Sequence, residues 1–272
     1  MEPGWRAESP SSSETDAIAA VTRMQQRSIK GFPPYGIDIV LKFGGSLTRD
    51  LRSCRELVAA IAELGRRGIG ILIVPGGGRT DKVIEAIDQE QALASDTAHR
   101  ACALAQDQTG LILCDPSFSR DLIACEKLGK CRAVLARQRI PVLLPSRLLF
   151  DLDPVERSWA VTSDAVAAWV AWLVGAGRFA VLTDVDGVYR EGHVGDPAWL
   201  LDHIGFEALR RMGHTSIDAC AADFIATHRI DAAVINGLHP ERVTAWCMGE
   251  RTTATIIGEA TAIGAEICAT VA

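Results

Sequence analysis

The chain has 272 residues, of which 48% are hydrophobic and 23% are charged, which is typical of a globular protein with one large domain or two small ones. Its net charge of −6, with lysines and arginines scattered along the sequence, argues against a nucleic-acid backbone as the main partner. No stretch reaches the ~18 uninterrupted apolar residues of a membrane span and no secretory signal opens the chain, so we expect a cytoplasmic protein that does not enter membranes.

The first 36 residues differ from the rest of the chain. A polar, low-complexity run covers residues 8–14, and glycines and prolines interrupt residues 31–36. We therefore expect a mobile N-terminal extension over residues 1–36 and a folded domain over residues 37–272. The eight cysteines form no C-x-x-C pair and most lie in apolar stretches, so we expect buried thiols rather than a metal site or disulfides.

Strands and helices alternate from Ile37 onward. Short apolar runs predict strands at residues 37–43, 69–74, 111–113, 133–135, 142–144, 179–183, 232–235 and 252–257. Apolar positions at helical spacing predict helices at residues 51–67, 82–90, 96–108, 162–175, 204–212 and 218–228, the first of them capped by Asp50. This alternation with long connections predicts a three-layer α/β/α sandwich around a mainly parallel sheet.

Two glycine-rich turns follow the first two predicted strands. One runs through Lys42, Phe43, Gly44, Gly45 and Ser46, and the other consists of Gly76, Gly77 and Gly78. Glycine lets backbone N–H groups approach a phosphate, and the lysine adds a positive charge beside them. The spacings of a P-loop and of a dinucleotide-binding turn are both absent. Either turn alone is compatible with a tight structural connection, but together they predict a nucleotide pocket at the strand ends.

A third polar segment follows the strand predicted at residues 179–183. Its candidate functional residues are Thr183, Asp184, Asp186, Gly187 and Tyr189. Ligands of open α/β sheets bind at the carboxyl ends of the strands. We therefore expect Asp184 to hold Lys42 or to position a cation, and Thr183 and Tyr189 to line a nucleotide pocket. The alternative is an ordinary Asp-Gly turn with a solvated Asp186.

A fourth segment, Thr162-Ser163-Asp164, begins a predicted helix. These side chains can cap the helix, or they can leave its free N–H groups to bind an anion with the help of the helix dipole. The carboxylate of Asp164 suits a cation or a sugar-like hydroxyl better than a bare phosphate.

These four segments, in this order, resemble the amino acid kinase superfamily, which includes acetylglutamate, aspartate, carbamate and uridylate kinases. The resemblance covers residues 37 to about 258. It implies in-line transfer of the γ-phosphoryl group of ATP with Mg²⁺. It also implies that Lys42 neutralises the transferred group, that the two glycine turns hold phosphates and acceptor, and that Asp184 organises the lysine. Residues 183–189 would then pack on the nucleotide.

A closer resemblance links the chain to the branch that contains the methanofuran-pathway kinase, which phosphorylates (5-(aminomethyl)furan-3-yl)methyl phosphate. It rests on the segments at residues 95–100, 105–108, 145–147, 159–164 and 236–242. It implies that Asp96 and His99 face the acceptor, although the same residues also suit an exposed helix start. The amine of that acceptor needs a carboxylate partner, for which Asp96 and Asp164 are the candidates.

One departure from the family concerns residues 215–223, which lack the second lysine of acetylglutamate-type kinases and carry Asp218 in a context like that of uridylate kinases. We therefore expect a small-molecule phosphomonoester acceptor, and we expect the protein to be a homo-oligomer. The alternatives are a uridylate-like or acetylglutamate-like kinase and, from another class, an ATP-binding molybdenum or tungsten storage protein.

Overall fold

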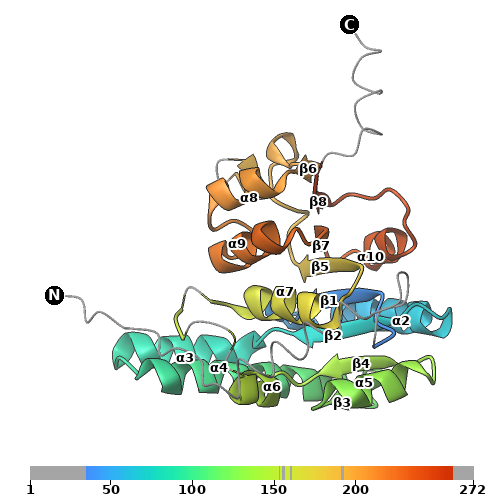
Figure 1. Cartoon of the computed structure of the whole chain (residues 1–272), viewed down its shortest axis with the longest axis horizontal. Coiled ribbons are helices and arrows are strands. Elements are labelled where there is room, and N and C mark those ends of the chain that lie inside the picture. Colours follow the sequence, from blue (N-terminus) through green and yellow to red (C-terminus); the bar gives the residue numbers. More distant parts are fainter. Residues whose placement is uncertain (1–34, 153, 155–156, 160, 191–192, 260–272) are drawn as a thin grey trace, which may run out of the picture.

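The computed structural model describes residues 35–259 except 153, 155–156, 160 and 191–192 (Figure 1). The predicted N-terminal extension, residues 1–36, lies outside the described residues except for its last two positions, so its separation from the domain stays a prediction. Within the described ranges, no helix has the length and apolar character needed to cross a membrane.

One sheet of eight strands forms the centre of the described chain. Its strands are β1 (Ile39–Phe43), β2 (Ile71–Pro75), β3 (Leu122–Cys125), β4 (Ile140–Leu143), β5 (Arg178–Thr183), β6 (His203–Ile204), β7 (Ala232–Asn236) and β8 (Thr255–Ile257). They lie in the order β3-β4-β2-β1-β5-β7-β8-β6. All neighbours are parallel except β7 and β8. The strand that carries Lys42 therefore lies inside the sheet, between β2 and β5.

Helices cover both faces of this sheet. They are α2 (Leu51–Arg66), α3 (Gly78–Glu90), α4 (Ser95–Leu113), α5 (Leu128–Leu135), α6 (Ser146–Leu152), α7 (Ser163–Val174), α8 (Phe206–Met212), α9 (Ala219–His228) and α10 (Pro240–Cys247), with short 3-10 helices η1 (Gly45–Thr48) and η3 (Pro197–Trp199). One hydrophobic cluster joins the sheet to α5, α7 and α9, and a second joins it to α2 and α10. The predicted three-layer sandwich is confirmed.

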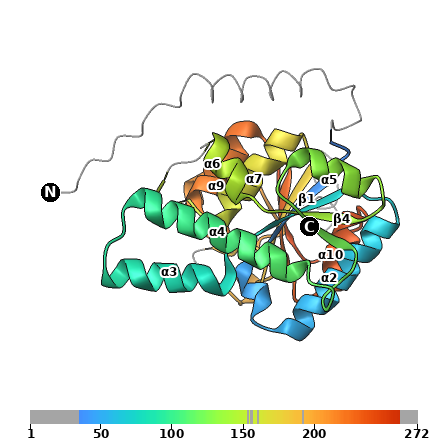
Figure 2. The same cartoon turned by 90° about the horizontal axis from the view of Figure 1, so that it is seen from below.

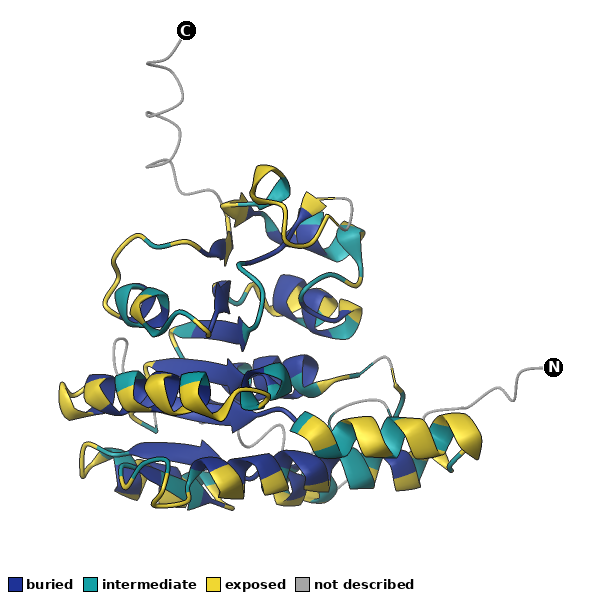
Figure 3. Ribbon diagram, turned by 180° about the vertical axis from the view of Figure 1, so that it is seen from behind, coloured by how far each residue is buried: buried dark blue, intermediate teal, exposed yellow. Residues whose placement is uncertain are grey.

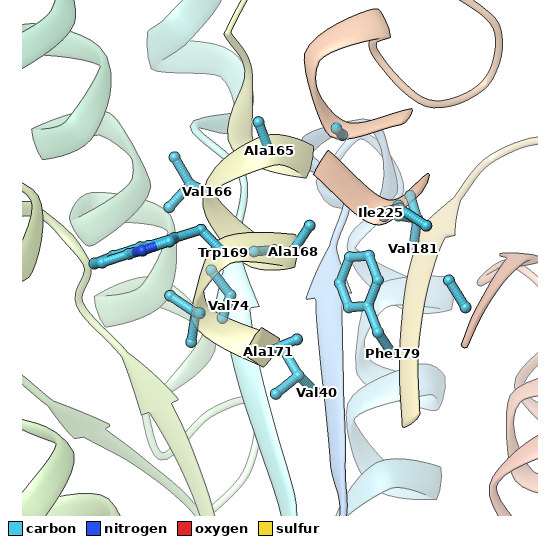
Figure 4. Packing of buried hydrophobic residues seen from close by; sticks show 14 of the residues in the cluster. Val40, Val74, Ala165, Val166, Ala168, Trp169, Ala171, Phe179, Val181 and Ile225 are labelled. Atoms are coloured by element: carbon cyan, nitrogen blue, oxygen red, sulfur yellow. The ribbon is translucent and has the colours of Figure 1, made fainter. Parts of the chain in front are cut away.

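The alternation of side chains along each strand explains the two clusters. In β1, Val40 belongs to the cluster with α7 and α9 (Figure 4). Ile39 and Leu41 belong to the cluster with α2. Successive side chains of a strand point to opposite faces, so a strand covered on both faces must be apolar throughout. Figure 3 shows the resulting pattern, with buried strands between helices that are exposed on their outer sides. Polar side chains are thereby left to the strand ends, where the candidate site lies.

The middle of the chain differs from the prediction. The helix expected at residues 96–108 and the strand expected at residues 111–113 form the single helix α4, and the strand expected at residues 133–135 belongs to α5. Leu111 is 54% exposed whereas Leu113 is fully buried, which is the pattern of an amphipathic helix rather than of a strand. A three-residue apolar run does not distinguish the two structures. Strand β3 was missed because only four residues form it, at the edge of the sheet.

We expect Phe179→Ala to lower the free energy of unfolding by about 3–5 kcal/mol, because it leaves a cavity between β5 and the helices α7 and α9. Phe179 is fully buried in the cluster that contains α7 and α9. Urea titration followed by circular dichroism measures the change. Val83→Ala is the control, since Val83 is 58% exposed on α3, and it should change stability by less than about 0.5 kcal/mol. Equal losses in the two variants would contradict the assigned core.

Candidate active site

The two glycine-rich turns contact each other at the carboxyl ends of β1 and β2. The N–H of Gly76 donates to the carbonyl of Phe43 at 2.8 Å. A Cβ on Gly45 would lie 2.6 Å from both the backbone nitrogen and the Cα of Gly78. Only glycine allows this approach, because backbone atoms cannot move aside as a flexible side chain can. The parallel pairing of β1 with β2 thus brings the two predicted turns to one place.

The main charged contact of the site joins Lys42 to Asp164. The Lys42 side chain leaves β1 and places its Nζ 2.7 Å from Oδ1 of Asp164, in the first turn of α7. Only about a tenth of each side chain is exposed, so salt screens the pair weakly. We expected Asp184 to hold Lys42, and this role was assigned to the wrong carboxylate. Asp184 lies 3.6 Å from the exposed side chain of Arg49. Lys42 follows Val40 by two residues and therefore points to the face of β1 that packs against α7, where Asp164 lies.

A second set of contacts fixes Asp164 from the side of α9. The backbone N–H of Asp218 donates to Oδ2 of Asp164 at 3.4 Å, and the hydroxyl of Thr162 donates to Oδ2 of Asp218 at 2.5 Å. Asp218 also caps α9 by accepting from the N–H of Ala221. Burial, together with the charge of Asp164, raises the pKa of Asp218. The segment at residues 215–223, in which we looked for a second lysine, therefore offers Asp164 the backbone N–H of Asp218. The carboxyl group of Asp218 is buried.

A cavity of about 650 Å³ opens beside these groups. Its wall contains eight of the residues predicted from the sequence: Lys42, Gly45, Ser46, Gly77, Gly78, His99, Thr162 and Ser163. Residues of the wall that the sequence analysis missed include Arg49, Arg79, Asp81, Lys82, Gln106 and His214. Asp81 and Lys82 follow Gly78 by three and four residues, and this helical spacing was a usable signal for both. His214 comes from a loop without a recognisable pattern.

Asp96 lies outside this wall, so its predicted contact with the acceptor is not supported. Its carboxylate is 3.0 Å from the guanidinium of Arg100 and 3.1 Å from that of Arg157. Asp96 begins α4 with its side chain about half exposed, which is the exposed helix start considered as the alternative above. His99, one turn further along the same helix, does line the cavity. Its predicted contact with the acceptor stays a prediction.

Asp186 is engaged in a structural contact at the carboxyl ends of β5 and β7. It accepts from Nδ2 of Asn236 at 2.8 Å and from Nη1 of Arg242 at 2.6 Å. The hydrogen bond from Asn236, followed by that from Arg242, holds the pKa of Asp186 below its usual range. Asp186 therefore has two side-chain partners rather than water alone, and its role in binding the nucleotide stays a prediction. The charge of Asp186 fixes the loop after β5 against the start of α10.

The rest of that loop packs closely against the sheet. A Cβ on Gly187 would lie 2.3 Å from Oγ1 of Thr255, and Tyr189 is buried. The carbonyl of Thr183 accepts from the N–H of Gly237 at 2.8 Å. These residues shape the edge of the sheet next to the glycine turns. A direct role of Thr183, Gly187 and Tyr189 in binding a nucleotide stays a prediction.

The first glycine turn also contacts β5. The N–H of Gly44 donates to the carbonyl of Leu182 at 2.9 Å, and a Cβ on Gly44 would lie 2.4 Å from that oxygen. Around the turns the cavity wall is basic, with Lys42 inside and Arg49 and Arg79 at the rim. The guanidinium of Arg79 donates to the carbonyl of Arg49 at 3.3 Å. Backbone N–H groups beside basic side chains form a surface that suits phosphate groups.

We expect Gly45→Ala to lower the thermal midpoint of unfolding by several degrees, since the added methyl group forces the two glycine turns apart. A loss of about 1–3 kcal/mol, as for other overpacked sites, corresponds to this shift in a domain of this size. Gly129→Ala is the matched control, because a Cβ on Gly129 in α5 meets nothing within 4 Å. It should leave the midpoint equal or slightly higher. An unchanged midpoint in Gly45→Ala would contradict the contact between the turns.

The family expected from the sequence is found by comparison with known proteins. A model described as the amino acid kinase family matches residues 39–236. The [5-(aminomethyl)furan-3-yl]methyl phosphate kinase of Methanocaldococcus jannaschii is 29% identical over 204 residues, which cover 75% of this chain and 90% of that protein. A uridylate kinase of Methanococcus maripaludis is 26% identical over 243 residues, which cover 81% of this chain and 99% of that protein.

A solved structure supports the same fold. The uridylate kinase from Archaeoglobus fulgidus matches with a TM-score of 0.64 at 22% sequence identity, over 82% of this chain and 100% of that one. The family model spans the central strands, both glycine turns and the start of α7 that holds Asp164. The protein belongs to the amino acid kinase family and is a phosphotransferase.

Proposed function

We propose that the protein transfers the γ-phosphoryl group of ATP to a small phosphomonoester, and that this acceptor is (5-(aminomethyl)furan-3-yl)methyl phosphate. The observation that carries the proposal is the buried pair of Lys42 and Asp164 beside two glycine turns that touch each other. The name of the relative from Methanocaldococcus jannaschii supports the acceptor. The cytoplasmic location and the homo-oligomeric state stay predictions.

The geometry suits phosphoryl transfer without covalent participation of the protein. Catalysis of this reaction rests on holding donor and acceptor in line and on neutralising the charge of the transferred group. The ammonium of Lys42 lies in the wall of the cavity, next to Gly45 and Gly78. In our proposal the backbone N–H groups of the turns hold phosphate oxygens, and Asp164 keeps Lys42 directed between them.

ATP would bind on the side of the loop after β5, with residues 184–189 beside the nucleotide. Asp184 is about a third exposed at this edge, and an exposed arginine is its ion-pair partner. A carboxylate in this position suits the water shell of a Mg²⁺ ion that the phosphates of ATP bring with them. Bound magnesium would supply positive charge to the phosphate oxygens of ATP. Among the described residues, no three side chains of His, Cys, Asp or Glu gather in a group that would hold a metal ion.

The acceptor would occupy the cavity between α3, α4 and the start of α7. Basic side chains at its rim, Arg49, Arg79 and Lys82, favour a ligand that already carries a phosphate. UMP is the second candidate, because the relative from Methanococcus maripaludis and the solved structure from Archaeoglobus fulgidus are uridylate kinases. A storage function, the alternative from another class, would require purified protein that carries metal-oxide clusters and transfers no phosphoryl group.

We expect Lys42→Met to lower kcat at least about a hundredfold while changing the KM for ATP far less, because the ammonium acts on charge that grows in the transition state. Methionine keeps the aliphatic stem and removes the charge. The control is Lys130→Met on the exposed surface of α5, which should keep full activity. A Lys42→Met variant with near-normal kcat would assign the lysine a purely structural role.

We expect the furan phosphate to be the best substrate in a panel with UMP, acetylglutamate and aspartate. The basic cavity rim favours the two phosphates, and the similarity to the kinase of Methanocaldococcus jannaschii favours the furan phosphate over UMP. Steady-state kinetics with ATP and Mg²⁺, with the products identified by mass spectrometry, gives kcat/KM for each acceptor. Faster turnover of UMP would establish the second candidate. Faster turnover of either carboxylate substrate would refute the phosphomonoester proposal and leave the family assignment intact.

A further inference from the structure

Helices α3 and α4, joined by the short connection at residues 91–94, lie side by side in opposite directions (Figure 2). Both contribute residues to the wall of the cavity. The residues that line the cavity include Gly78, Asp81 and Glu85 from α3 and His99, Cys102 and Gln106 from α4. Both sets have the spacing i, i+3, i+7, which is one face of a helix. Two helix faces are therefore turned toward the ligand.

The carboxyl group of Asp81 is only partly satisfied. Its Oδ1 is screened from bulk water and has no hydrogen-bond partner. The group does interact with the thiol of Cys102, with the backbone N–H of Gly77 and, without a close ion pair, with the charges of Lys82 and Lys42. Burial raises the pKa of Asp81, and burial also raises the pKa of Cys102, to about 12, so the thiol stays a neutral donor. A cation in the cavity would stabilise the ionised carboxylate.

A second oxygen without a donor comes from Gln106. This residue is 5% exposed, lies in the cavity wall, and its Oε1 has no hydrogen-bond partner. Gln106 follows Cys102 by one helical turn on the same face of α4, next to the thiol that contacts Asp81. A hydrogen bond between the two helices supports this placement. The hydroxyl of Thr80, next to Asp81, donates at 3.0 Å to Oε1 of Gln108, two residues after Gln106. Buried acceptors without donors are rare because each costs free energy, so a ligand donor is expected here.

The other acidic groups around the cavity already have cationic partners. Glu85, the second carboxylate of the described wall, lies 2.6 Å from Nζ of Lys82. Asp164 is paired with Lys42 at 2.7 Å. Asp96 lies outside the wall. Of the two carboxylates in the described wall, Asp81 is thus the one that combines an oxygen without a hydrogen-bond partner with the lack of a close ion pair.

We propose that Asp81 and Gln106 bind the protonated primary amine of the acceptor, an inference that rests on the proposed function. A primary ammonium carries a positive charge and three N–H donors, so one group satisfies the carboxylate and the amide oxygen together. The glycine turns, Arg49 and Arg79 suit the phosphate of the same molecule. The cavity therefore selects a small molecule with a phosphate at one end and an ammonium at the other.

The test crosses enzyme variants with acceptor variants. The probes are (5-(aminomethyl)furan-3-yl)methyl phosphate and (5-methylfuran-3-yl)methyl phosphate, which lacks only the amine. We expect the wild-type enzyme to prefer the amine in kcat/KM by about 10- to 100-fold, the range for a charged hydrogen-bonded contact. In Asp81→Asn the preference should fall toward unity while the KM for ATP stays unchanged. Gln106→Leu should reduce the preference less, and Asp96→Asn is the control that should retain it.

The outcomes separate this inference from the proposed function. If the wild-type enzyme turns over both furan phosphates equally well, the ammonium site is refuted and the kinase proposal stands. If Asp96→Asn loses the preference and Asp81→Asn keeps it, the site has been assigned to the wrong carboxylate. If neither furan phosphate is turned over, the proposed function fails and the inference fails with it. Thermal melting and ATP binding verify that each variant is folded, and Gln106→Leu decides the question if Asp81→Asn does not fold.

Discussion

The buried ion pair of Lys42 and Asp164 is the contact on which the candidate site depends. Two charges removed from water are stable only when each has a close partner, and the loss of one partner from such a pair costs about 3–5 kcal/mol. Here the ammonium lies 2.7 Å from the carboxylate, and Asp164 has a further contact with the backbone N–H of Asp218. The pair connects β1, α7 and α9, so the position of the lysine is set by three elements that are distant in sequence.

The parallel sheet brings these elements together. Strands β1, β2, β5 and β7 all end at the same edge, and each is followed by a polar or glycine-rich segment. The contact between Gly45 and Gly78 closes the distance between the first two segments. The hydrogen bonds of Asp186 to Asn236 and Arg242 fix the other two against each other. The apolar strands thus determine where the polar groups meet.

The sequence predicted the site where short-range signals were strong. Glycines after an apolar strand identified both turns, the first of them together with Lys42. The cap at Asp50 and the helix start at Thr162 were confirmed. The partner of Lys42 was mistaken, because Asp164 and Asp184 both follow suitable signals and only the packing of α7 beside β1 distinguishes them. Gln106 lies in a segment that carries the closer resemblance, and Asp81 follows the second glycine turn at helical spacing, but neither signal assigned the residue a role. Their position together comes from the packing of α3 against α4, which sequence spacing alone does not reveal.

Residues 215–223 lack the second lysine that the family resemblance led us to look for, and this affects how charge is distributed in the site. In this chain the far side of Asp164 contacts a backbone N–H at the start of α9, which offers a partial positive charge instead of a full one. Within the described contacts, Asp164 therefore holds one ammonium group, that of Lys42. The other positive side chains of the described cavity wall, Arg49, Arg79 and Lys82, have no described contact with Asp164. In the proposed function, the arginines that line the cavity would bind the phosphate that the acceptor already carries. A small carboxylate, which has no such phosphate, would suit the site less well.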